Sequence, residues 1–129
     1  MKWRVLGFDT PSGRPSGPAL QYLADTLEGL GLHTALQPVT IREVEQHNLV
    51  AWAGPATAGG LILCGHVDTV PFADQPGWSS DPLTLTVRDD RVYGRGTADM
   101  KGFLAQCVAA LRGLELDRLT RPLVLAFTA

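Results

Sequence analysis

A histidine and an aspartate two positions apart form the densest group of chemically useful residues in the chain. His66 and Asp68 lie in the segment 65–71, directly after the apolar run 61–64. In extended backbone, residues two apart share a face, so both side chains project to one side. A carboxylate beside a histidine can fix the ring tautomer and raise its basicity, as it does for histidines that bind metals. The alternative is a loop histidine that only forms hydrogen bonds.

A second group, the segment 94–102, carries an aspartate to the start of an expected helix. Gly94 and Gly96 permit tight backbone turns, and Asp99 follows at the mouth of the helix, where the helix dipole favours a carboxylate. Taken alone, Asp99 is either a helix-capping aspartate or a site residue. The segment has neither the G-x-G-x-x-G nor the Walker pattern, so nucleotide binding is a poor interpretation.

The elements that position these residues alternate between helix and strand. Leucines recur at spacings of three and four from Pro18 to about Gly29, which predicts an amphipathic helix, and a second apolar stripe predicts another from Asp99 to about Gly113. We therefore expect an α/β fold with a mostly parallel or mixed sheet and helices on its faces. The expected strands are 32–39, 48–53, 61–64 and 123–129, with a hairpin formed by 83–87 and 92–93 and a strand-to-strand turn at 54–60.

The composition excludes several classes of protein. The chain has 129 residues, 45% of them hydrophobic, which suits one compact unit. Eleven basic and thirteen acidic side chains give a net charge of −2, so we expect no nucleic-acid partner. No apolar stretch approaches the roughly 20 residues of a membrane helix, and the N-terminus lacks a secretory signal, so we expect no membrane contact and a cytoplasmic location. Cys64 and Cys107 lie in apolar segments and are expected to be buried, reduced thiols.

The two motifs together are more specific than either alone. Gly-His-Val-Asp-Thr-Val-Pro at 65–71, followed by Gly-Thr-Ala-Asp-Met-Lys-Gly at 96–102, resembles the zinc-dependent aminoacylase and carboxypeptidase-like metallopeptidase family. Within it the sequence is most similar to the acetylornithine deacetylases. The similarity extends to the segments 7–12, 47–49 and 78–85.

The resemblance implies roles for three side chains. His66 would bind one zinc ion and Asp99 would bridge two, with cobalt or manganese as alternative metals. Asp68 would be the catalytic-site carboxylate that orients His66. The resemblance also implies a cis peptide bond between Asp99 and Met100. It suggests no metal role for Arg95 and Lys101, which are expected to be solvated or structural. His33 and His47 are expected to be structural.

The resemblance further implies that residues 1–129 form an incomplete catalytic domain of the zinc-exopeptidase type. The family has a general-base glutamate and an adjacent glutamate ligand after the strand that corresponds to 123–128. A catalytic zinc has three protein ligands, whereas His66 and Asp99 are two, so the chain alone is expected to bind metal weakly and to be inactive. The C-terminal half and a dimerisation domain are expected outside the chain, with a homodimer as the complete form. The last strand is expected to lie unpaired on one side.

The function implied is hydrolysis of the amide bond of an N-acyl amino acid, with N-acetylornithine as the expected substrate and arginine biosynthesis as the setting. The segments 78–83 and 97–103 favour this over the succinyl-diaminopimelate desuccinylases, which share the same motifs. Peptide hydrolysis by a dipeptidase or carboxypeptidase relative is a second enzymatic hypothesis. The alternative hypothesis, from outside the enzymes, is that the chain is a non-catalytic remnant of a broken gene.

Overall fold

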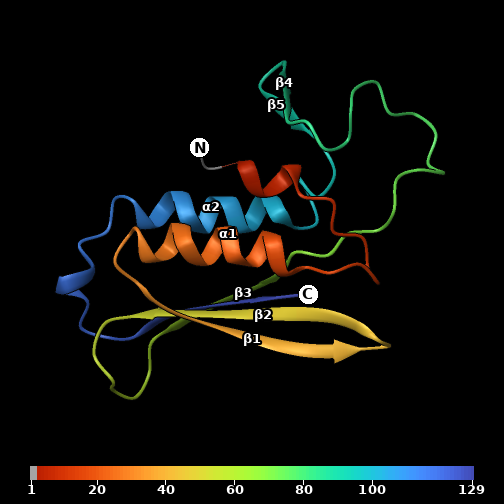
Figure 1. The fold of residues 1–129 in the computed structure, drawn as a ribbon. Helices are drawn as coiled ribbons and strands as arrows, with labels where there is room; N and C mark the ends of the chain where they lie inside the picture. Colours follow the sequence, from red (N-terminus) through yellow and green to blue (C-terminus); the bar gives the residue numbers. More distant parts are fainter. Residues whose placement is uncertain (1–2) are drawn as a thin grey trace.

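The computed structural model describes residues 3–129, in which helices and strands alternate along the chain (Figure 1). Each helix and strand expected from the sequence is present, within a few residues of the expected bounds. In chain order, the elements are the 3-10 helix η1 (Arg4–Gly7), α1 (Gly17–Glu28), β1 (His33–Ile41), β2 (Val44–Ala53), β3 (Leu61–His66), β4 (Thr86–Arg88), β5 (Arg91–Tyr93), α2 (Lys101–Leu111), the 3-10 helix η2 (Leu116–Arg118) and β6 (Leu123–Thr128).

Four strands form a mixed sheet in the order β1-β2-β6-β3, and β4 and β5 form a separate hairpin. β2 is antiparallel to both β1 and β6, whereas β3 is parallel to β6. The segment 54–60 therefore crosses from β2 to β3 past a gap of one strand, and β6 fills that gap. Because β6 has a partner on each side, the expectation that the last strand lies unpaired on one side was wrong.

Both helices cover the same face of the sheet (Figure 1). α1 packs on β1 and β2, and α2 packs on β3. Alternate residues of β6 point toward the helices and are buried, as a strand with one covered face requires. Burying each large apolar side chain contributes about 1.5–3 kcal/mol, so this layer is the main source of stability. The core includes Leu20, Leu23, Leu27, Leu49, Leu104, Leu125 and Phe127.

The other face of the sheet explains why the expectation for one cysteine was wrong. Cys107 is buried in α2, and burial raises the pKa of its thiol. Cys64 is exposed, because it lies in the edge strand β3 between residues that face the helices. An apolar run in such a strand buries only alternate side chains, and Ile62 is exposed for the same reason.

The hairpin begins later than its sequence pattern predicts. β4 starts at Thr86, because Asp81 folds the preceding residues into a turn. The Asp81 carboxylate accepts hydrogen bonds from the Leu83 N–H at 3.0 Å and from the Thr84 hydroxyl at 2.7 Å. These two bonds favour the charged form and lower the pKa of Asp81, the Leu83 bond contributing more.

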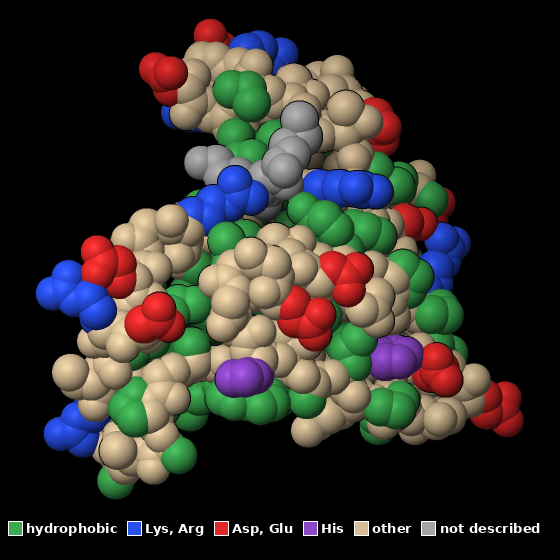
Figure 2. Space-filling view, turned by 60° about the vertical axis from the view of Figure 1, so that its left-hand side comes forward, with side chains coloured by type: hydrophobic (Ala, Val, Ile, Leu, Met, Phe, Trp, Pro, Cys, Tyr) green, Lys and Arg blue, Asp and Glu red, His purple; other side chains and the backbone are tan. Residues whose placement is uncertain are grey.

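The surface of the described residues shows basic and acidic side chains mixed together on the face in Figure 2. This distribution agrees with the net charge of −2. Within residues 3–129, the helices are all too short or too polar to cross a lipid bilayer.

Candidate metal centre

His66 lies at the carboxyl end of β3, beside the start of α2. In parallel sheets, ligand sites form at this end of the strands. Gly65 lets α2 approach closely, since a Cβ there would lie 2.8 Å from Leu104 Cδ2 and 3.0 Å from Met100 Cε. The close approach brings the loop before α2 to the end of β3, where β6 pairs Thr128 with His66.

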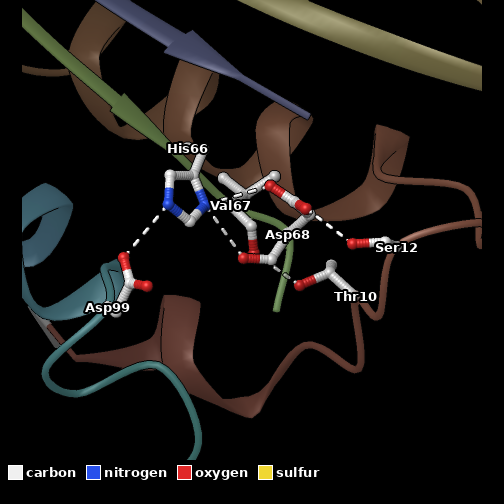
Figure 3. A network of polar contacts seen from close by, with 6 residues as sticks. All are labelled: Thr10, Ser12, His66, Val67, Asp68 and Asp99. Carbon is white, nitrogen blue, oxygen red and sulfur yellow. Dashed lines mark hydrogen bonds and ion pairs between the residues drawn. The ribbon is translucent and has the colours of Figure 1, made fainter. Parts of the chain in front are cut away.

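Asp68 lies against one nitrogen of the His66 ring (Figure 3). His66 Nδ1 is 3.0 Å from Asp68 Oδ1 and 3.0 Å from the Asp68 backbone oxygen. An Nδ1–H that donates to Asp68 leaves the lone pair on Nε2. The side chains of His66 and Asp68 are 35% and 34% exposed, so the pair is partly shielded from water. The two residues that the sequence analysis placed on one side of the strand do converge.

Asp99 faces the other nitrogen of the same ring. Its Oδ1 lies 3.1 Å from His66 Nε2, and its side chain is 83% exposed. The N-cap position of α2 is Met100, and no side-chain capping bond is formed there. Because the Asp99 carboxylate contacts the histidine and not the helix amides, the capping interpretation was wrong. The peptide bond between Asp99 and Met100 is cis, as the resemblance implied.

Three glycines shape the loop that carries Asp99. Gly94 and Gly96 have φ values of 154° and 81°, which residues with side chains rarely adopt. Gly102 lies so close to the loop that a Cβ would be 2.0 Å from the Thr97 carbonyl oxygen. Its N–H donates to the Gly96 carbonyl at 2.9 Å. The loop is therefore folded back onto the first turn of α2.

A cavity of about 310 Å³ opens beside these side chains, and His66, Asp68 and Asp99 all line it. A second cavity of about 470 Å³ is also lined by Asp68 and Ser12. Asp68 therefore borders both cavities. The first is of the size that holds small-molecule ligands.

The N-terminal segment braces Asp68, a contact that the sequence analysis missed. Thr10 Oγ1 donates to the Val67 carbonyl at 2.7 Å, and the Thr69 N–H donates to the Thr10 carbonyl at 2.9 Å. Ser12 Oγ donates to Asp68 Oδ2 at 2.7 Å. Both carboxylate oxygens of Asp68 therefore have a partner. The one available signal was the polar segment within the family similarity at 7–12, since the partners are 56 and 57 positions apart.

Arg95 ties the rim of the site together and is structural. Its guanidinium lies over the Trp78 ring, 5.0 Å from the centroid, a favourable cation–π arrangement. It also donates to the Gln75 side chain and, at 3.5 Å, to the Pro71 carbonyl. Arg95 thereby fastens the rim loop 71–82 to the loop 94–100.

The remaining residues without an expected metal role lie elsewhere. His33 stacks on Trp52 with ring centroids 5.6 Å apart, and His47 lies 3.8 Å from Glu45. Neither histidine lines the cavity beside His66. Lys101 is fully buried, which excludes a solvated role for it.

The donors that meet at the site suit a zinc ion. With Nδ1–H bound to Asp68, His66 Nε2 presents a lone pair to a carboxylate oxygen 3.1 Å away, a contact that requires a proton or a cation between the atoms. Imidazole nitrogen and carboxylate oxygen are both ligands that zinc prefers. Within residues 3–129, no three His, Cys, Asp or Glu side chains converge closely enough to form a metal site alone. The described residues therefore fit two ligands of a zinc ion.

Solved structures share the fold of this chain, and one of them is a metallopeptidase of the M20 family. Human carnosine dipeptidase 1 matches with a TM-score of 0.79 and 25% identity, over 98% of this chain and 30% of that one. The M20 family metallo-carboxypeptidase Sso-CP2 from Sulfolobus solfataricus matches with a TM-score of 0.79 and 23% identity, over 98% of this chain and 29% of that one.

Sequence comparison gives the family. The profile of peptidase family M20/M25/M40 matches residues 62–129, more than half of the chain, so the chain belongs to this family. The acetylornithine deacetylase of Photorhabdus laumondii is 47% identical over 85% of this chain and 28% of its own length. That of Proteus mirabilis is 45% identical over 97% of this chain and 32% of its own length. The chain thus spans about a third of the curated relatives it matches, and the predicted family is confirmed.

Proposed function

We propose that residues 1–129 form the front part of the catalytic domain of a zinc-dependent amidohydrolase that removes the acyl group from an N-acyl amino acid. N-acetylornithine is the proposed substrate, because relatives named acetylornithine deacetylase are 45–49% identical to the chain. The observation that carries the proposal is the convergence of His66 Nε2 and Asp99 Oδ1 at 3.1 Å in an open cavity. The complete enzyme would hold two zinc ions and form a homodimer; its cytoplasmic location stays a prediction.

Each of the three site residues has a distinct task. His66 Nε2 and the Asp99 carboxylate would hold the metal, and Asp68 holds the His66 ring so that Nε2 faces the cavity. Bound zinc polarises an amide carbonyl and lowers the pKa of water. The cavity of about 310 Å³ admits a small acyl amino acid beside these ligands.

Removing a proton from the attacking water requires a base within hydrogen-bond reach. No glutamate lines the cavity within residues 3–129. We place this base, with a further ligand, after β6, where the resemblance implies two glutamates. The Val67 N–H donates to the Thr128 carbonyl at 2.8 Å, so residues after β6 would begin next to the His66–Asp68 segment. The chain alone is then inactive.

A dipeptidase is the second candidate, because human carnosine dipeptidase 1 has the same fold and 25% identity over this chain. The higher identity of the acetylornithine deacetylases favours deacylation. Comparing the rates of hydrolysis of N-acetylornithine and of dipeptides distinguishes the two candidates. Both kinds of substrate contain an amide bond, and they differ in the groups attached to it.

The experiment compares the 129-residue chain with a version extended through the codons downstream of Ala129. We expect only the extended protein to hold about two zinc ions and to release ornithine from N-acetylornithine. His66→Gln abolishes both in that protein, whereas His47→Gln, the matched control away from the cavity, leaves both unchanged. Activity of the short chain contradicts the placement of the base. Faster hydrolysis of a dipeptide supports the second candidate, and absence of zinc binding in both proteins supports a non-catalytic remnant.

A further inference from the structure

Lys101 is one of the largest fully buried side chains of the described residues, with 0% of its surface exposed. It is the first residue of α2, two positions after Asp99. Its stem passes close to Gly96, whose Cβ, if present, would lie 3.3 Å from Lys101 Cγ and Cδ. A buried ammonium group is costly unless it has polar partners. The partners of Lys101 therefore indicate what it does.

The ammonium group is bound to the N-terminal segment. Lys101 Nζ donates to the Phe8 carbonyl at 2.6 Å, across 93 positions of the chain. Burial lowers the pKa of Lys101 to about 8, while the charges of Asp9 and Asp68 act in the opposite direction. The ammonium thus lies between the end of η1 and the segment that carries Asp68.

The Phe8 carbonyl stands at the beginning of the segment that braces Asp68. From there the chain runs beside 67–69, with Thr10 bonded to Val67 and Ser12 bonded to Asp68. Figure 3 shows this bracing on one side of the His66 ring and Asp99 on the other. Lys101 connects the Asp99 side with the braced side, because its backbone is part of α2 and its ammonium donates to the Phe8 carbonyl.

We propose that Lys101 is a positioning residue of the metal centre, which sets the separation between Asp99 and the His66–Asp68 pair by binding α2 to the segment 8–12. The effect on metal binding rests on the proposed function, whereas the Lys101–Phe8 bond is present without metal. Lys101→Met keeps the volume of the stem and removes the ammonium, which leaves the Phe8 carbonyl without the Lys101 donor. Loss of a group that hydrogen-bonds a metal ligand directly lowers metal affinity about 10–100-fold. Lys101 acts through the segment 8–12, so we expect a loss at the lower end of this range, about tenfold.

The first measurement is hydrogen exchange of the metal-free chain. In Lys101→Met we expect the amides of Ser12 and Thr69, which bond across the two segments, to exchange at least about tenfold faster while amides of β6 keep their rates. Leu111→Ala is the matched control, because it removes a buried side chain at the far end of α2. That variant should speed exchange in the helix and sheet without singling out Ser12 and Thr69. The second measurement compares the zinc affinity of Lys101→Met with that of wild type, by competition with a chelator.

Wild-type protection of Ser12 and Thr69 in Lys101→Met overturns the proposal. So does a local loss of protection with unchanged zinc affinity. If neither the wild-type chain nor its extended version binds zinc, the metal role in the proposed function fails, and the exchange data alone decide whether Lys101 positions the two segments. If Lys101→Met does not fold, Lys101→Gln replaces it: its amide stops short of the ammonium position, so the same local loss is expected and wild-type protection would overturn the proposal.

Discussion

The two segments that meet at the candidate metal centre are held in different ways. The segment with His66 and Asp68 pairs with β6 and is braced from the other side by residues 10–12. Its two polar side chains are about one-third exposed. Asp99 lies on a loop, its side chain is 83% exposed, and its carboxylate contacts His66.

This difference shows where each half of the site obtains its order. Side-chain hydrogen bonds orient the histidine half, so the ring is already set when a cation arrives. Backbone packing orients the aspartate half, since the loop 94–100 is pressed against Gly102 while the carboxylate itself is solvated. Replacing a side chain in the histidine half should therefore change the orientation of the His66 ring. Replacing the Asp99 side chain should change only the chemical group offered to the metal.

The largest effect should come from Gly102→Ala, which attacks the backbone packing. The new Cβ would lie 2.0 Å from the Thr97 carbonyl oxygen, so the loop must move. We expect the free energy of unfolding to fall by about 3 kcal/mol or more, measured by urea denaturation. Gly113→Ala is the control, because its nearest atom is 4.0 Å away. Equal costs for the two variants would show that the loop is not held by this contact.

Asp99→Asn should separate ligand chemistry from folding. Loss of a charged ligand is expected to lower zinc affinity by about 100-fold or more. The affinity is measured in the 129-residue chain or, if that chain binds no zinc, in the extended protein. The free energy of unfolding should change by less than about 0.5 kcal/mol, because the side chain is 83% exposed. Asp74→Asn, on the exposed rim, should change neither quantity. A stability loss in Asp99→Asn that matches its affinity loss would contradict the contrast between the two halves.

Ser12→Ala should weaken the histidine half more gently. It removes the hydrogen bond of 2.7 Å to Asp68 Oδ2 and leaves the contact between Asp68 and His66 in place. We expect a loss of about tenfold in zinc affinity and about 1 kcal/mol in stability, from chelator competition and thermal unfolding. Ser79→Ala on the rim serves as the control. An unchanged zinc affinity in Ser12→Ala would mean that the hydrogen bond from Ser12 does not help to orient Asp68.

The smallest effect should be a pH dependence in the rim outside both halves. The folded pKa of Asp81 is lowered from its ordinary value of 3.8, mainly by the Leu83 N–H and then by the Thr84 hydroxyl. A lowered folded pKa means that stability is present above pH 3.8 and is lost as the pH falls through the folded value. The difference in urea midpoint between wild type and Asp81→Asn should therefore shrink below about pH 4. A difference that stays constant from pH 7 to pH 2.5 would contradict this.

Several features of the fold and site could be read from local patterns. The leucine spacing after Pro18 predicted α1, and the position of His66 after an apolar run predicted its place at a strand end. The pattern could not show that β3 is an edge strand, so Cys64 was expected to be buried and is exposed. It also could not order the strands, because an apolar run looks the same in the middle and at the margin of a sheet.

The sequence by itself determined the two motifs, the family and the convergence of His66 with Asp68, because these depend on residues that are neighbours in the chain. Only the tertiary structure decided what surrounds them. Ser12 reaches Asp68 across 56 positions and Lys101 reaches the Phe8 carbonyl across 93. Such contacts arise when α2 and the N-terminal segment pack on the end of β3, and no local periodicity records that packing.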